Sequence, residues 1–133
     1  MKLPLICTEQ GSIAGVFYSL EDAAGYLEPV DIYNNEYDFF DADGYVVEAY
    51  VVGGNQKQKH KFLFFEYWLI NHYSGEIRFR RKLPLELQRD ELIKLLINSL
   101  RNQNQSVDTN NLDDLIKKFP FYLNGKEHSP NNL

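Results

Sequence analysis

The sequence predicts an α+β fold, an antiparallel β-sheet of about five or six strands with one early short helix and two C-terminal helices covering one face. Three observations predict it. Short apolar runs separated by turn residues fill residues 3–83, apolar residues recur at helical spacing over 20–27, and helical spacing returns from residue 88. The 133-residue chain is 44% hydrophobic and 25% charged, as one folded domain should be. We expect a single domain over 1–123 and a frayed polar tail over 124–133.

The N-terminal residues predict a β-hairpin followed by a helix. Apolar runs cover Leu3–Cys7 and Ile13–Tyr18, and a Gln-Gly-Ser turn signal lies between them. A helix of about two turns is predicted over Leu20–Leu27, because a Ser-x-x-Asp capping box precedes apolar residues at helical spacing. Pro29 is expected to end this helix.

The middle of the chain predicts the rest of the sheet. Strand-like runs over Glu36–Phe40 and Tyr45–Val52 are joined by Asp41–Gly44, whose Asp-Gly pair is a strong hairpin signal. Residues Phe62–Ile70 are apolar or aromatic on both alternating faces, so they are predicted to form the central strand, covered on both sides. Glu76–Leu83 alternates apolar residues with arginine and is predicted to be a half-exposed basic strand.

Two helices are predicted after the sheet. Residues 88–102 place leucine and isoleucine on one side of a helix and basic residues elsewhere. A last short helix is expected to be capped by Asn110 or Asn111 and to stop at Pro120.

Charge is segregated along the chain, whose formal net charge is −5. Residues 3–56 contain ten acidic residues and no lysine or arginine, whereas residues 57–133 contain 13 basic and 9 acidic residues. Halves of opposite sign within one fold can produce a negative and a positive face, which attract partners of complementary charge. Alternatively, the two regions attract each other within the fold and leave a mixed surface. The ten acidic residues are Glu9, Glu21, Asp22, Glu28, Asp31, Glu36, Asp38, Asp41, Asp43 and Glu48.

Residue spacing supports no metal site, cofactor site or enzyme class. Cys7 is the single cysteine, so an internal disulfide and a cysteine-based zinc site are excluded. His60, His72 and His128 form no HxH or HExxH pattern. The Asp-x-Asp-Gly stretch at 41–44 is similar to a fragment of a calcium loop, but the other ligand positions of that loop do not hold carboxylates. We therefore expect a protein that is not an enzyme.

Nucleic acid and membranes are disfavoured as partners. The basic residues of 78–82 could contact phosphates, but an isoelectric point near 5.1 and the acidic half oppose this. Basic residues on an edge strand also protect it from edge-to-edge aggregation. No apolar run approaches the roughly 18 residues of a membrane helix, and the N-terminal apolar stretch breaks too early for a signal sequence. A cytoplasmic protein is expected.

A resemblance to a group of proteins covers about a quarter of the chain. It rests on the segment SLEDAAGYLEPVD at 19–31, Glu36-Tyr37, and FDADG at 40–44. These residues resemble a group of small acidic, largely uncharacterised bacterial proteins. They are similar to immunity proteins of contact-dependent growth-inhibition and related polymorphic toxin systems. The resemblance implies a shared fold, because the matching residues are a helix cap, a helix stop and a turn.

Charge and resemblance together lead to a functional hypothesis. Tyrosines interleaved with carboxylates supply rigid contact area and charge complementarity toward a basic surface. We expect a non-catalytic immunity or antitoxin-like protein that binds a cognate toxin domain, for example a basic nuclease, and neutralises it without a cofactor. The expected partner-binding residues are Glu36, Tyr37, Asp38, Asp41, Asp43, Tyr45 and Glu48.

Two alternatives stay open. The chain could be a small structural or regulatory module that self-associates, or binds a host protein, through the aromatic strand around Trp68. The third choice is a small-ligand binder or an enzyme that uses Glu66 or a histidine in a pocket. A buried Glu66 paired with an arginine such as Arg78 is the commoner explanation for that glutamate.

Overall fold

The computed structural model describes residues 1–53, 57–62, 65–70, 75–120, 122–123 and 126–127, and side chains for 1–53 and 75–120. In chain order the strands and helices are β1 (Leu5–Glu9), β2 (Ser12–Phe17), α1 (Leu20–Tyr26), α2 (Pro29–Tyr33), β3 (Asp38–Phe40), β4 (Val46–Val52), β5 (Lys57–Phe62), β6 (Phe65–Ile70), β7 (Glu76–Arg81), α3 (Arg89–Asn102), α4 (Leu112–Lys117), β8 (Tyr122–Leu123) and β9 (Lys126–Glu127).

The main sheet is antiparallel, in the order β7-β4-β3-β1-β2-β8-β9, and confirms the α+β class. Five strands of three to seven residues form its body, and the two-residue strands β8 and β9 extend one edge. The β1–β2 and β3–β4 hairpins are those that the turn signals predicted. The proposed domain boundary at residue 123 falls beside residues that the structure does not describe.

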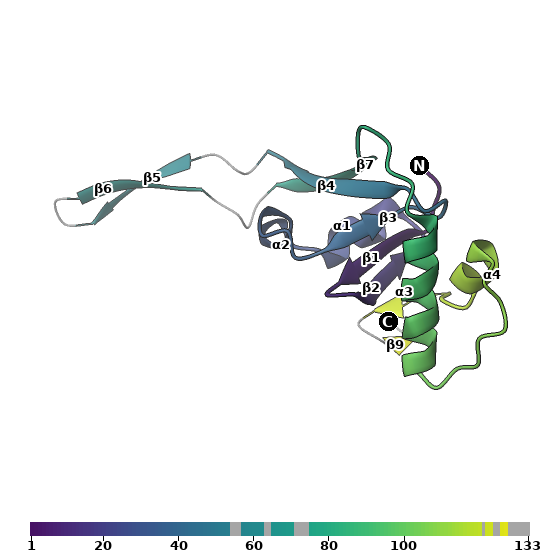
Figure 1. Ribbon diagram of the computed structural model, residues 1–133. Coiled ribbons are helices and arrows are strands. Elements are labelled where there is room, and N and C mark those ends of the chain that lie inside the picture. The colour runs from purple at the N-terminus through teal and green to yellow at the C-terminus, as the bar shows by residue number, and fades with distance from the viewer. Residues whose placement is uncertain (54–56, 63–64, 71–74, 121, 124–125, 128–133) are drawn as a thin grey trace.

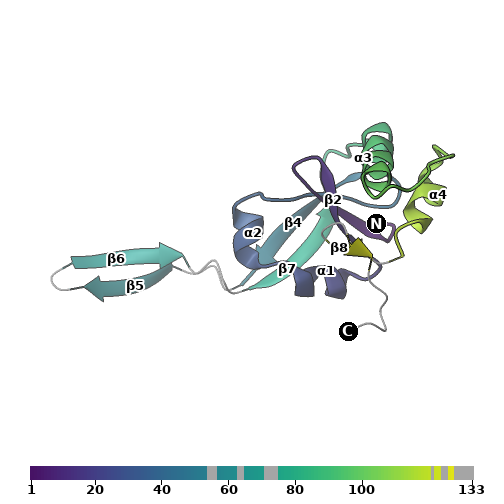
Figure 2. The ribbon, with the colours of Figure 1, turned by 90° about the horizontal axis from the view of Figure 1, so that it is seen from below.

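Helices cover both faces of this sheet, which corrects the expectation that they cover one face (Figures 1 and 2). Ile6 packs into a cluster with residues of α3 and α4, whereas its neighbours Leu5 and Cys7 pack on the opposite face with residues of α1. All three side chains are fully buried. Because successive strand residues point to opposite faces, a strand that is apolar at every position needs cover on both sides.

The helix ends follow from local capping. The Ser19 hydroxyl accepts a hydrogen bond from the Asp22 N–H at the start of α1, and the Asn111 side chain accepts one from the Asp114 N–H at the start of α4. Pro29, predicted to stop the first helix, is also the first residue of α2, which sequence periodicity missed.

The strand predicted to be central lies in a separate sheet. Strand β6 pairs residue by residue with β5 in a two-stranded sheet of its own. In Figure 1 this hairpin extends away from the main sheet, beyond the ends of β4 and β7. Periodicity correctly predicted a strand within 62–70, which is β6. Its hydrogen-bonded neighbour, however, is the preceding polar strand over 57–62. Whether its side chains are covered lies outside the described residues.

Candidate functional site

The carboxylate of Asp41 lies inside the protein, at the turn between β3 and β4. Its Oδ1 accepts hydrogen bonds from the backbone N–H groups of Asp43 and Tyr45, each at 3.0 Å. Its Oδ2 accepts one from Arg81 Nε at 2.6 Å, and that bond is the main reason why the pKa of Arg81 is raised. Asp41 is 0% exposed. It therefore shapes the turn and offers no surface to a partner, which corrects its place among the expected binding residues.

Three other expected binding residues contact the basic strand β7. Arg81 Nη2 lies 3.3 Å from Asp43 Oδ2, and its guanidinium carbon lies 4.3 Å from the centre of the Tyr45 ring. Arg80 Nε donates a hydrogen bond to Glu48 Oε1. These contacts neutralise part of the acidic half within the fold, as the alternative interpretation of the charge pattern predicted.

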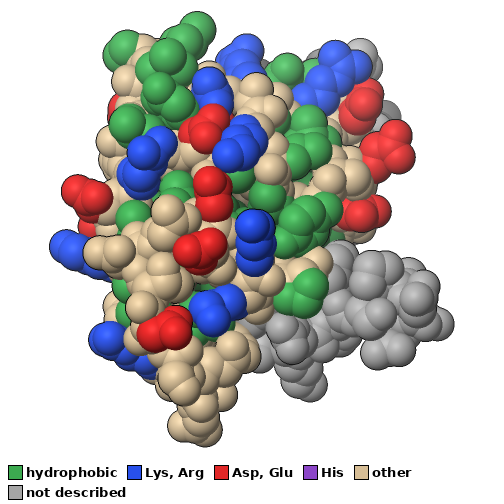
Figure 3. All heavy atoms as spheres, turned by 90° about the vertical axis from the view of Figure 1, so that its right-hand side faces the viewer, with side chains coloured by type: hydrophobic (Ala, Val, Ile, Leu, Met, Phe, Trp, Pro, Cys, Tyr) green, Lys and Arg blue, Asp and Glu red, His purple; other side chains and the backbone are tan. Residues whose placement is uncertain are grey.

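The face that carries α3 and α4 has a surface of mixed positive and negative charge. In Figure 3, lysine and arginine side chains are interspersed there with aspartate and glutamate. A partner of strong charge would find no uniform field on this side.

The remaining expected residues meet at the other end of β3. Strand register places Thr8 of β1 opposite Asp38, so Glu9, the next residue of β1, lies across from Tyr37 on the other face of the sheet. The Glu36 N–H donates to the Asp31 carbonyl oxygen at 3.1 Å, which brings the end of α2 to the same place. We call Glu9, Asp31, Glu36 and Asp38 the acidic cluster. Among the described residues, no lysine or arginine makes an ion pair with any of these four carboxylates.

The pKa values of Glu36 and Tyr37 are both raised at the acidic cluster. A hydrogen bond with Asp31, with burial and the charges of Asp31 and Glu9 adding to it, raises the pKa of Glu36. Burial, and then the charges of Glu9 and Asp31, raise the pKa of Tyr37 to about 12. Tyr37 is thus a half-buried, neutral ring beside concentrated negative charge. Such a surface has an amphipathic centre and an acidic rim.

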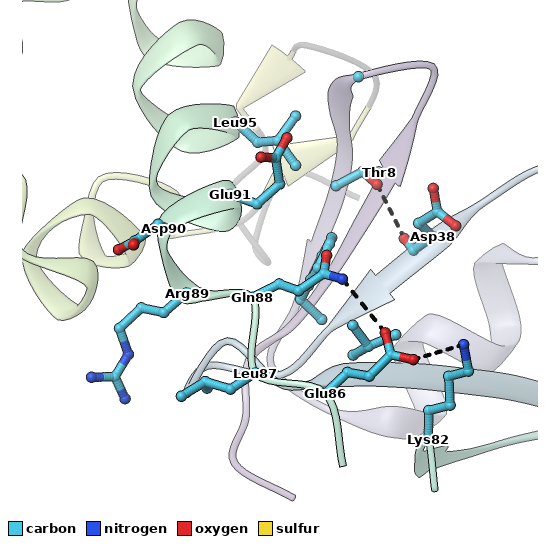
Figure 4. A pocket seen from close by; sticks show the side chains of 13 residues that line it. Thr8, Asp38, Lys82, Glu86, Leu87, Gln88, Arg89, Asp90, Glu91 and Leu95 are labelled. Atoms are coloured by element: carbon cyan, nitrogen blue, oxygen red, sulfur yellow. Dashed lines mark hydrogen bonds and ion pairs between the residues drawn. The ribbon is translucent and has the colours of Figure 1, made fainter. Parts of the chain in front are cut away.

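A groove of about 990 Å³ adjoins the acidic cluster at Asp38 (Figure 4). Its apolar lining includes Phe40, Val46 and Leu95. Glu91 and Leu95 lie on the side of α3 that faces β1 and β3, so Glu91 and Asp38 border the groove from opposite walls. The groove therefore combines an apolar lining with carboxylates on both sides.

A second cavity, of about 250 Å³, lies on the other side of Asp38. Tyr37 and Glu48 line it, as does Lys82, which also borders the groove. Lys82 Nζ lies 3.0 Å from Glu86 Oε1, so its charge is already paired. Asp38 is exposed and borders both hollows. It is the best placed of the expected residues to meet a partner.

Replacing Glu36 with glutamine is expected to raise Tm at about pH 7. Because the folded state raises the pKa of Glu36, the stability linked to its protonated form is present below the ordinary pKa and is lost as the pH rises through the raised value. At a pH above both the ordinary and the raised pKa, Glu36 of the wild type is fully charged and is repelled by Asp31 and Glu9. Glutamine carries no charge and removes this repulsion. At about pH 3 the carboxyl is protonated in both states, so the difference in Tm should vanish.

The matched control is Glu21→Gln, which removes the same charge in the first turn of α1, where the helix dipole favours an acidic residue. Thermal unfolding at both pH values should show no rise in Tm for this control. A rise equal to that of Glu36→Gln would mean that net charge, and not the acidic cluster, sets the effect.

Sequence reasoning missed Glu9, Asp31 and Glu91 as site residues. Glu9 and Asp31 were counted in the acidic half, but they lie 27 and 5 residues before Glu36 and were not on the predicted hairpin. Only the pairing of β1 with β3 and the turn after α2 bring them together. Glu91 belongs to the other half of the chain and had no sequence signal.

The residues considered for catalysis are not placed by the structure. His72, His128 and the side chains of His60 and Glu66 lie outside the described part of the chain. Within the part that is described, no group of three or more histidine, cysteine or acidic residues could hold a metal ion. Cys7 is buried, and its surroundings raise the pKa of the thiol, so it remains protonated.

Comparison with known proteins adds no match. No protein-family model, no curated protein and no solved structure matches this chain. Among the described residues, none of the helices has the length and apolar character needed to cross a bilayer.

Proposed function

We propose that this protein is a non-catalytic binding module whose acidic cluster, with the adjoining groove, binds a basic surface of another protein. The observation that carries the proposal is the gathering of four carboxylates that have no basic partner among the described residues. A hydrogen bond with Asp31, burial, and the charges of Asp31 and Glu9 raise the pKa of Glu36, so these three carboxylates lie close enough to repel one another. A partner that supplies lysine or arginine relieves this repulsion on binding.

The cluster also has the contact area that a protein interface needs. Tyr37 lies on the α1 face of the sheet, Phe40, Val46 and Leu95 line the groove on the α3 face, and Asp38 borders the hollows on both sides. Aromatic residues surrounded by charge complementarity are typical anchors of protein interfaces. By contrast, Asp43, Tyr45 and Glu48 already contact β7 and would contribute less.

The finer proposal is that the partner is a cognate bacterial toxin domain, which this chain neutralises as an immunity protein does. It is supported by the acidic surface and by the resemblance of residues 19–31, 36–37 and 40–44 to immunity proteins. A toxin that binds nucleic acid carries a basic substrate site, and an acidic surface can occlude such a site.

Titration against the C-terminal domain encoded by the adjacent reading frame tests this proposal. We expect nanomolar binding that weakens as salt is raised, because charge pairing contributes to it. Glu36→Gln combined with Asp38→Asn should weaken binding about tenfold or more and flatten the salt dependence.

The matched control is Asp108→Asn combined with Asp114→Asn, which removes the same charge from exposed positions after α3 and at the start of α4. Binding by this control should stay close to that of the wild type. Equal weakening by both double variants would show that net charge alone is responsible. Absence of binding at every salt concentration would refute the toxin partner.

A further inference from the structure

The hairpin of β5 and β6 is an arm with two free edges. Among the strands that the structure describes, each of the two pairs only with the other. Figures 1 and 2 both show the arm extending beyond the body of the protein. A two-stranded hairpin is marginally stable in water by itself, and a free edge is a template for another strand.

The two edges differ in sequence. Strand β5 carries Lys57, Lys59 and Lys61 at alternate positions, which is a pattern that discourages strand pairing. Strand β6 reads FEYWLI, in which Glu66 is the single charged residue and the other five are apolar or aromatic. The β6 edge is therefore the one suited to pair with another strand.

We propose that β6 pairs antiparallel with β6 of a second copy of this chain, so that two arms form one four-stranded sheet. Pairing of identical edges closes on itself, as a two-fold dimer does. Pairing of β5 with β6 of another copy would instead continue into an open-ended ribbon, and pairing of two β5 strands would place six lysines on two adjacent strands, three on each face.

The six residues of β6 define the register. Full overlap of two antiparallel copies places Tyr67 opposite Trp68 of the second copy and Glu66 opposite Leu69 of the second copy. By symmetry each such pair occurs twice. The contact is short, smaller than a standard stable interface, so the dimer should form at micromolar concentrations or above.

Sedimentation of the full chain from about 1 µM to about 1 mM spans the dissociation constant expected for so small a contact. The mass should rise from one chain to two over this range. Leu69→Glu should lower the association constant about tenfold, because it places glutamate opposite Glu66 twice. Leu69→Lys places lysine opposite the same Glu66 and should leave association unchanged or strengthen it.

The matched control is Gln58→Glu, because Gln58 is the cross-strand partner of Leu69 but lies on the β5 edge. It adds the same charge to the same arm and should not change dimerisation. A mass of one chain at every concentration would overturn the proposal. A wild-type dimer that persists in Leu69→Glu, or one lost equally in Leu69→Glu and Leu69→Lys, would overturn the proposed β6 contact.

Discussion

Asp41→Ala is expected to lower the free energy of unfolding by roughly 3 kcal/mol, since two backbone N–H groups lose their acceptor inside the protein. These N–H groups belong to Asp43 and Tyr45, in the turn between β3 and β4. The substitution also removes the carboxylate that Arg81 Nε contacts at 2.6 Å. Denaturation with urea, followed by circular dichroism, measures the change.

Two further variants separate the contributions at this site. Asp41→Asn keeps one oxygen as an acceptor for the turn, so its effect should be smaller than that of alanine. Glu48→Gln removes the carboxylate from an ion pair whose side chains are 60% exposed at Arg80 and 40% exposed at Glu48, and should cost under about 1 kcal/mol. If Asp41→Ala were as mild as Glu48→Gln, Asp41 would not hold the turn.

Gly44→Ala is expected to destabilise the protein by about 3 kcal/mol, because strain and a steric clash act together. Gly44 has φ of +90°, in the region that favours glycine. A Cβ atom there would lie 2.8 Å from the Cα atom of Arg89, at the first residue of α3. The Gln88 N–H also donates to the Gly44 carbonyl oxygen at 2.8 Å, so the turn cannot easily move away.

Gly11→Ala is the matched control for the clash. Gly11 has a similar φ of +79° in the β1–β2 turn, but no atom lies within 4 Å of a Cβ placed there. Its substitution should therefore cost only the backbone strain, about 1 kcal/mol. Thermal unfolding of both variants compares them, and equal losses would show that contact with α3 does not constrain Gly44.

Both predictions concern the loop at 41–44, whose Asp41 and Asp43 were expected from the sequence to bind a partner. The pair Asp43-Gly44 predicted a hairpin turn at 41–44, and the turn was predicted correctly. The burial of Asp41 was not predicted, because its partner Arg81 is 40 residues away in the chain. Acidic residues exposed in a turn and acidic residues buried under an arginine have the same sequence pattern.

Local signals located most elements. The capping residues Ser19 and Asn111 marked two helix starts, and apolar spacing located α3, which begins within one residue of the expected position. The missed helix α2 spans only five residues, too short for periodicity to appear. Its signals were Pro29 after Glu28, and Asp31 at the position of a capping box.

Pairing between distant segments could not be read from periodicity. The aromatic run at 62–70 has the pattern of a strand, yet nothing in that pattern says whether it joins the main sheet or forms a hairpin with 57–62. The acidic cluster depends on the same kind of information, because Glu9 comes near Glu36 and Tyr37 only through the pairing of β1 with β3.

The sequence by itself determined the α+β class, the two hairpin turns, the helix caps and the segregation of charge, because each depends on neighbours a few residues apart. Tertiary structure alone decided which carboxylates are neutralised by β7 and which remain together beside a groove. The physical reason is that charge interactions depend on distance in space, and strand register sets that distance.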